Sequence, residues 1–171
     1  VLSGLLIVSI AAVPVPITTT PIQSPDESPD DTGGEIVFMS DRTGNWDIYR
    51  MEIHPSGRML DNIEYNLTDH PAEDVDPNWS PDGTQIVFAS DREDHDQELY
   101  IMDADGSNVQ RLTDSRGADF DPAWSPDGEW IVFSSNREST PFELYLIRPD
   151  GNDLQRITRE QGETRYADWQ P

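Results

Sequence analysis

Three tryptophans recur at a fixed interval and divide the chain into repeats. Trp79, Trp124 and Trp169 lie 45 residues apart. The first two open the same five-residue phrase, Trp-Ser-Pro-Asp-Gly. A repeat of this length indicates one small structural unit that is stacked several times along the chain.

A second phrase keeps the same register. Residues 86–92, Ile-Val-Phe-Ala-Ser-Asp-Arg, return in close form at 131–137, and a third copy lies at 36–42. Each copy is followed by an aromatic and apolar run, and each unit then closes on Leu-Thr or Ile-Thr. Short β-rich runs with turn signals between them, at a period of about 40–50 residues, are typical of β-propeller blades.

Each full unit reads as four short strands. The turn Ser80-Pro81-Asp82-Gly83 has proline second and glycine fourth, as a type I turn prefers, and residues 125–128 repeat it. The run that follows is apolar on both alternating faces, which suits a sheet packed between two others. We therefore predict an all-β chain, a β-propeller built of four-stranded antiparallel blades. The repeats are expected at about 35–75, 76–120 and 121–165, with an orphan first strand at 166–171.

The positions expected to shape every repeat are those that recur. We expect the repeated tryptophans in the core between blades, with a carbohydrate-stacking platform as the alternative. The full set of structural repeat positions is Trp79, Trp124, Trp169, Asp82, Asp127, Gly83, Gly128, Tyr49, Tyr100 and Tyr145.

Three blades are fewer than the four to eight that typically close a propeller. The first unit has no tryptophan phrase of its own, so it supplies only three strands. Two alternatives follow from this count. Either the chain is a fragment of a longer propeller, or two copies join as a homodimeric six-bladed ring in which each lends its terminal strand to the other's first blade.

The residues before the repeats have a different composition. Residues 1–17 are uncharged and largely apolar, but the stretch is shorter than the roughly 20 residues of a spanning helix. It has no initiator methionine or positive flank, so we interpret it as the remnant of a membrane anchor or signal segment, with a buried strand as the alternative. Residues 18–34 are rich in Pro, Thr and Asp and read as a linker. An anchor or signal segment followed by a linker and then the repeats predicts an extracytoplasmic protein, periplasmic or at the cell surface, that is membrane-anchored or secreted.

The charge excludes one class of partner. The formal net charge is -23, from 34 acidic and 11 basic residues. Nucleic acid binding needs clustered basic residues, so we predict no nucleic acid partner. Many of the aspartates fall in turns, where they bond local backbone, although an acidic face for a basic partner is the alternative. There are no cysteines, which excludes disulfides and thiol catalysis.

The side chains that could carry chemistry do not form a recognisable set. His54, His70 and His95 do not recur at the repeat spacing, so we interpret them as loop residues. Residues 103–108 resemble the start of a calcium loop but lack its terminal glutamate, which favours a hairpin turn. No nucleophile elbow, P-loop or kinase signature is present. We therefore predict no catalytic residue, no metal and no cofactor.

Five residues are candidates for ligand binding. Arg42, Arg92 and Arg137 follow the second strand of each unit. We expect them to pair with Asp76 or Asp121 and to pin one strand to another. A ring of arginines facing a ligand is the alternative, since a guanidinium fork suits carboxylates. The other two candidates lie outside the repeated tryptophan position and could stack on a ligand: Trp46 and Trp130.

The phrase Asp-Pro-x-Trp-Ser-Pro-Asp-Gly, at 76–83 and 121–128, resembles the repeat of the TolB-type, WD-repeat-like β-propeller family. The resemblance covers residues 35–171. It implies a six- or seven-bladed propeller, often extracytoplasmic, that serves as a protein-interaction platform. Such blades also occur as substrate-gating domains of larger hydrolases and as outer sensor domains of membrane-anchored kinases or regulators.

We therefore expect a non-enzymatic platform for a protein or peptide partner, with the gating or sensor role as the alternative. A third hypothesis, direct catalysis such as lactone hydrolysis at a central metal, requires an inward cluster of Asp, Glu or His.

Overall fold

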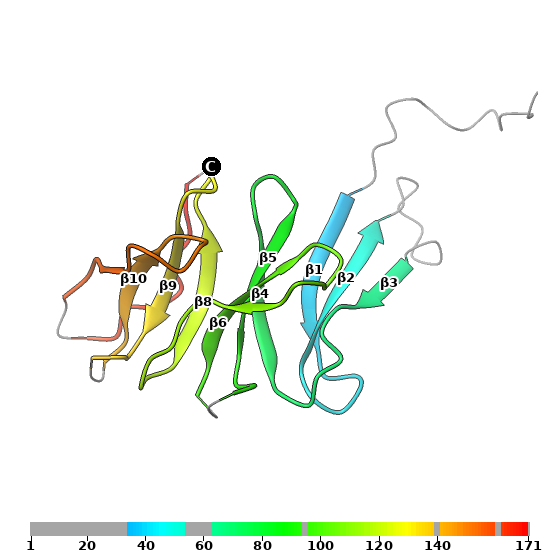
Figure 1. Cartoon of the computed structure of the whole chain (residues 1–171), viewed down its shortest axis with the longest axis horizontal. Helices are drawn as coiled ribbons and strands as arrows, with labels where there is room; N and C mark the ends of the chain where they lie inside the picture. Colours follow the sequence, from blue (N-terminus) through cyan, green and yellow to red (C-terminus); the bar gives the residue numbers. More distant parts are fainter. Residues whose placement is uncertain (1–33, 54–62, 94–95, 139–140, 160–161, 171) are drawn as a thin grey trace, which may run out of the picture. The chain divides into compact units, whose positions relative to one another are not determined.

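The computed structural model describes residues 34–53, 63–93, 96–138, 141–159 and 162–170 (Figure 1). The predicted anchor, nearly all of the predicted linker, His54 and His95 lie outside the described residues. Every strand belongs to one compact unit, Gly33–Pro171. The described part of the chain forms no helix that could span a membrane.

The strands form three antiparallel sheets that follow one another along the chain, as predicted. The first sheet has three strands, β1 (Gly34–Ser40), β2 (Asp47–Ile53) and β3 (Ile63–Asn66). The second has four, β4 (Asp74–Trp79), β5 (Gln85–Ser90), β6 (Glu98–Asp103) and β7 (Gln110–Arg111). The third also has four, β8 (Asp119–Trp124), β9 (Ile131–Ser135), β10 (Glu143–Ile147) and β11 (Gln155–Arg156). The all-β class and the repeated antiparallel blades are confirmed.

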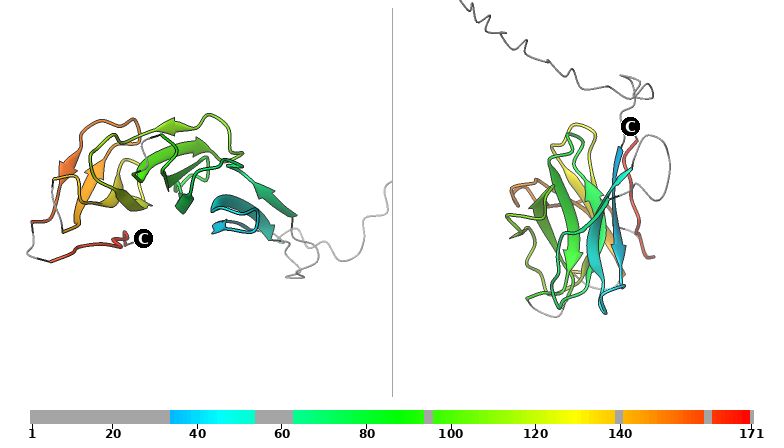
Figure 2. Two further views of the ribbon diagram at one scale, coloured as in Figure 1. Left: turned by 90° about the horizontal axis from the view of Figure 1, so that it is seen from below. Right: turned by 90° about the vertical axis from the view of Figure 1, so that its right-hand side faces the viewer.

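The second sheet packs against the other two (Figure 2). Successive side chains of β5 point to opposite faces, as in any strand. Phe88 therefore enters one apolar cluster with Ile48 of the first sheet, while Val87 enters another with Phe133 of the third. The apolar character of both faces of β5 follows from this double burial, as the sequence predicted.

The first strand of each full blade has the same irregularity. The ladder between β4 and β5 shifts between Val75 and Asn78, and the ladder between β8 and β9 shifts at the equivalent position. Asp76 and Asp121, inside these bulges, both have φ of 53°. Aspartate tolerates this left-handed conformation better than most residues. The aspartate that recurs at this repeat position therefore favours the bulge in both blades.

A buried carboxylate closes each full blade. In the second sheet the Thr113 hydroxyl donates to Glu98 at 2.6 Å and accepts from the Leu99 amide at 2.9 Å. The Ser115 amide also donates to Glu98, at 2.7 Å. The threonine that ends each repeat therefore ties the loop after the outer strand to the start of the third strand.

Stability is expected to fall as pH rises from about 5 to above 7, because burial raises the pKa of Glu98 to about 7 from an ordinary 4.5. Between these values the folded protein holds a proton that the unfolded chain releases, so its contribution is greatest below about 4.5 and is lost as pH rises through the folded pKa. Glu98→Gln should flatten this dependence. Urea midpoints at pH 5 and 7.5 test it, and parallel pH profiles for the two proteins would contradict the assignment.

The predicted fourth strand of each full unit is present but short. It spans two residues in both sheets, at β7 and β11. The described residues 162–170 contain no strand, and the orphan first strand expected at 166–171 stays a prediction. A strand needs a partner strand. The Thr164 amide donates to the Phe142 carbonyl at 2.8 Å, as the equivalent amides of Asp74 and Asp119 donate to the loops before β2 and β6.

Candidate functional site

The repeated turns after β4 and β8 have the same internal bonds. The Gly83 amide donates to the Ser80 carbonyl at 2.9 Å, as expected of a type I turn. The Ser80 hydroxyl donates to Asp82 at 2.7 Å, and this bond holds the pKa of the Asp82 carboxyl below its ordinary value. The Ser125 hydroxyl lowers the pKa of Asp127 in the same way. Both carboxylates therefore stay ionised at neutral pH.

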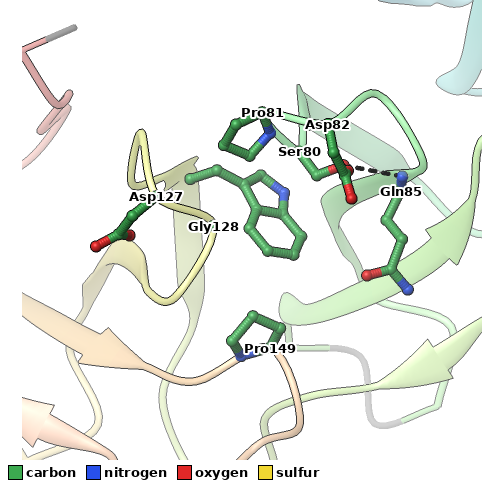
Figure 3. Close-up of a pocket in the computed structure, with 8 residues that line it drawn as sticks. Ser80, Pro81, Asp82, Gln85, Asp127, Gly128 and Pro149 are labelled. Atoms are coloured by element: carbon green, nitrogen blue, oxygen red, sulfur yellow. Dashed lines mark hydrogen bonds between the residues drawn. The ribbon is translucent and has the colours of Figure 1, made fainter.

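A pocket of about 240 Å³ opens between these two turns (Figure 3). Figure 3 shows Pro81 and Pro149 at opposite ends of it, with Asp82 and Asp127 on either side. The pocket is lined by Ser80, Pro81, Asp82, Gln85, Trp124, Asp127, Gly128 and Pro149.

Trp124 is the largest side chain of this pocket. It is 7% exposed and belongs to the core cluster between the second and third sheets. Its indole N–H is buried and has no hydrogen-bond partner among the described residues.

A second polar group lies where the first strands of neighbouring sheets meet. The Asp121 amide donates to the Asp76 carboxylate at 3.4 Å. Burial, and then the charge of Asp121, raise the pKa of Asp76. Arg165 lies 3.6 Å from the Asp121 carboxylate. In the described part of the chain, no group of three or more His, Cys, Asp or Glu side chains could hold a metal ion.

The repeated arginines pair with different aspartates from those expected. Arg92 donates to Asp74 at 2.9 Å and Arg137 donates to Asp119 at 2.7 Å, whereas the expected partners were Asp76 and Asp121. The bulge explains the difference, because it displaces the later aspartates from the regular ladder. Asp74 lies directly opposite Ser90 in that ladder, close to Arg92.

Both guanidinium groups are also enclosed by aromatic rings. Arg92 lies 4.9 Å from the centroid of Tyr100, and Arg137 lies at the same distance from Tyr145. Their side chains are 13% and 12% exposed. Arg42 stacks similarly on Tyr49, at 4.4 Å, but its side chain is 44% exposed and pairs with Glu64.

The two other binding candidates lie outside the pocket. Trp46 is 37% exposed, and its carbonyl accepts a hydrogen bond from the Asp74 amide. Trp130 is half-buried, and the guanidinium of Arg148 lies 4.0 Å from its ring centroid. One face of Trp130 is therefore already covered.

The remaining aromatic repeat positions pack within the sheets or, at Trp169, beside the third sheet. Trp79 is partly buried against the cluster between the first and second sheets, and Trp169 donates its indole N–H to the Ala123 carbonyl at 3.2 Å. Each repeated tyrosine packs against the phenylalanine opposite it in the ladder, at 5.8 Å between ring centroids: Tyr49, Tyr100 and Tyr145.

The residues of the calcium-like segment form a turn, as the sequence favoured. The Ser107 amide donates to Asp105 at 2.9 Å, and the Asn108 side chain donates to Asp103 at 2.7 Å. His70 likewise bonds within its own loop, accepting from the Ala72 amide at 3.1 Å.

The pocket itself could not be read directly from the sequence. The two turns were identified separately, and Trp124 was assigned to the core. The available signal was the 45-residue spacing of the turns, because stacked blades bring equivalent turns side by side. Pro149, from the hairpin after β10, also lines the pocket, but the spacing of the turns does not indicate this.

The repeats match a family model and two curated proteins. A family model described as the TolB beta propeller domain matches residues 75–171. An uncharacterized protein of Agrobacterium fabrum is 39% identical over 95 residues, which cover 52% of this chain and 30% of that protein. The uncharacterized peptidase YuxL of Bacillus subtilis is 49% identical over 38 residues, which cover 22% of this chain and 6% of the peptidase.

A solved structure shares the architecture. The structure of a putative TolB from Agrobacterium tumefaciens superposes with a TM-score of 0.62 at 31% identity, over 71% of this chain and 44% of that one. The chain therefore spans less than a third of the curated relatives named here and under half of this solved structure.

Proposed function

Because this chain belongs to the TolB β-propeller domain family, we propose that it is a non-enzymatic, extracytoplasmic platform that binds a protein or peptide partner. The pocket at Trp124 between two repeated acidic turns is the observation that supports this proposal most directly. The apolar residues 1–17 and the linker composition of residues 18–34 support the extracytoplasmic location.

The chemistry of the pocket favours an extended, basic, proline-containing peptide. Pro81, Pro149 and Trp124 offer apolar surface of the kind that proline-rich segments contact. The ionised carboxylates of Asp82 and Asp127 suit a lysine or arginine. The net charge of -23 adds attraction for a basic partner at long range.

Binding is expected to weaken about tenfold in the double variant Asp82→Asn, Asp127→Asn, because two rim charges together contribute on the order of 1–2 kcal/mol. Asparagine keeps the oxygen that accepts from Ser80 and Ser125, so the turns should persist. The probe is an acetylated hexapeptide of alternating proline and lysine. Its titration is followed by the indole N–H resonance of Trp124 in ¹H–¹⁵N spectra.

The matched control is Asp105→Asn with Asp150→Asn, two turn aspartates that accept local backbone bonds but do not line the pocket. These changes should leave the affinity unaltered. A hexapeptide with glutamate in place of lysine should not bind. If the Trp124 resonance is unmoved by the lysine peptide, the proposed site is wrong.

The match to the peptidase YuxL favours a second candidate, an accessory propeller that gates substrate for a larger hydrolase. The coding sequence on either side of these residues distinguishes the two. A nucleophile elbow of the Gly-x-Ser-x-Gly type in the same reading frame would support the accessory role.

A further inference from the structure

A second, smaller pocket borders the turn at residues 80–83. Its volume is about 170 Å³, and it is lined by Glu35, Trp79 and Gly83. No atom lies within 4 Å of the place where a Cβ on Gly83 would stand, so the turn is open at this point. The other three residues of the same turn line the pocket at Trp124. The turn is therefore a ridge between two pockets, each formed by two neighbouring sheets.

The two pockets share their main parts, because the repeat places equivalent residues in both. Trp79 and Gly83 lie 45 residues before Trp124 and Gly128. In each pocket the tryptophan ends the first strand of a blade, and the glycine ends the turn that follows it. The residue before the Ile-Val-Phe phrase of the preceding sheet also lines each pocket: Glu35 or Gln85. The pocket at Trp124 therefore has a counterpart one blade earlier.

Each of the three sheets contributes a carboxylate beside these pockets. Glu35 belongs to the first sheet, Asp82 to the turn of the second and Asp127 to the turn of the third. The side chain of Glu35 is 41% exposed, and its carboxylate lies 3.4 Å from Arg50. Arg50 is shared with Glu52, at 3.5 Å, so one cation serves two carboxylates there. The negative charges thus follow one another from sheet to sheet, which suits a ligand whose cations are spaced along an extended chain.

We propose that one basic, proline-containing peptide runs across the sheets, over the turn at residues 80–83, and places a basic side chain at each pocket. This inference rests on the proposed function, since it needs the pocket at Trp124 to bind such a peptide. Sheets that stack face to face lie about 10 Å apart. A polyproline II helix has three residues per turn and rises about 3.1 Å per residue, so every third side chain lies on the same side, about 9 Å from the last. Lysines three residues apart therefore match the spacing of the sheets.

Two acetylated hexapeptides of the same composition test this register. One is Lys-Pro-Pro-Lys-Pro-Pro, and the other, with adjacent lysines, is Lys-Lys-Pro-Pro-Pro-Pro. Their charges are equal, so long-range attraction to the acidic chain does not distinguish them. The indole N–H resonances of Trp79 and Trp124 in ¹H–¹⁵N spectra report the two pockets separately. The spaced peptide should shift both resonances with one dissociation constant, and it should bind about threefold more tightly than the other, the effect of one additional exposed ion pair.

Glu35→Gln should remove this threefold advantage of the spaced peptide. Glu52→Gln is the matched control, because Glu52 also pairs with Arg50 and its side chain is 44% exposed, but it does not line the pocket. This change should leave the advantage intact.

Equal affinities for the two peptides, or equal effects of the two glutamine variants, would overturn the proposed register. So would a spaced peptide that shifts the Trp124 resonance and leaves that of Trp79 unmoved, although peptide binding at Trp124 would then stand. If neither resonance moves, the proposed function fails and this inference fails with it.

Discussion

Arg137→Ala is expected to lower the free energy of unfolding by about 3–5 kcal/mol, because it leaves a buried charge without its partner. Asp119 is fully buried, and Arg137 donates to one of its oxygens at 2.7 Å. The neighbouring Glu98 carboxyl, whose pKa is raised by burial and by the charge of Asp119, is itself acidic and supplies no replacement positive charge. Urea denaturation gives the loss.

The repeat supplies a matched control at Arg42. This residue occupies the equivalent position, but its ion pair with Glu64 is exposed. The side chains of Arg42 and Glu64 are 44% and 36% exposed. Arg42→Ala should therefore cost no more than about 1 kcal/mol. Equal losses at the two positions would contradict the burial argument. Adding Asp119→Ala to Arg137→Ala should cost less than the sum of the single changes, since the two groups act as a pair.

Phe133→Ala is expected to cost about 3–5 kcal/mol as well, for a different reason. Phe133 is fully buried in the cluster between the second and third sheets, where its ring stacks on Tyr145. Close packing leaves little room for neighbours to fill the cavity that alanine would create.

The corresponding residue of the first sheet again serves for comparison. Phe38 carries the same phrase and stacks on Tyr49, but it is only partly buried. Phe38→Ala should cost clearly less in thermal or urea unfolding at low protein concentration. A similar cost at both positions would contradict the burial argument.

The repeat period predicted the sheets because one phrase must meet the same packing requirement each time it occurs. Residues 86–89 are apolar on both faces, and only a sheet with neighbours on both sides buries them. The Ser-Pro-Asp-Gly turns carry their own geometry in their residue types, so they were predicted as well.

The partner of each arginine could not be read from the pattern. Asp74 and Asp76 lie two residues apart in the same strand. The sequence alone gives no reason to prefer either aspartate as the partner of Arg92. The choice depends on the bulge, a backbone feature set by the left-handed φ of Asp76. The orphan first strand at 166–171 stays a prediction, because a sequence pattern identifies a segment able to pair but not the strand with which it pairs.

The double burial of β5 makes the folding of the three sheets interdependent. Its side chains divide between the two apolar clusters, so disruption of the middle sheet would remove part of both interfaces at once. Each outer sheet, in contrast, faces a described neighbour on one side only. In a stack held by nearest-neighbour contacts, the ends can open while the centre stays folded, but the centre cannot open alone. The middle blade is therefore the cooperative unit on which the stability of the whole array depends.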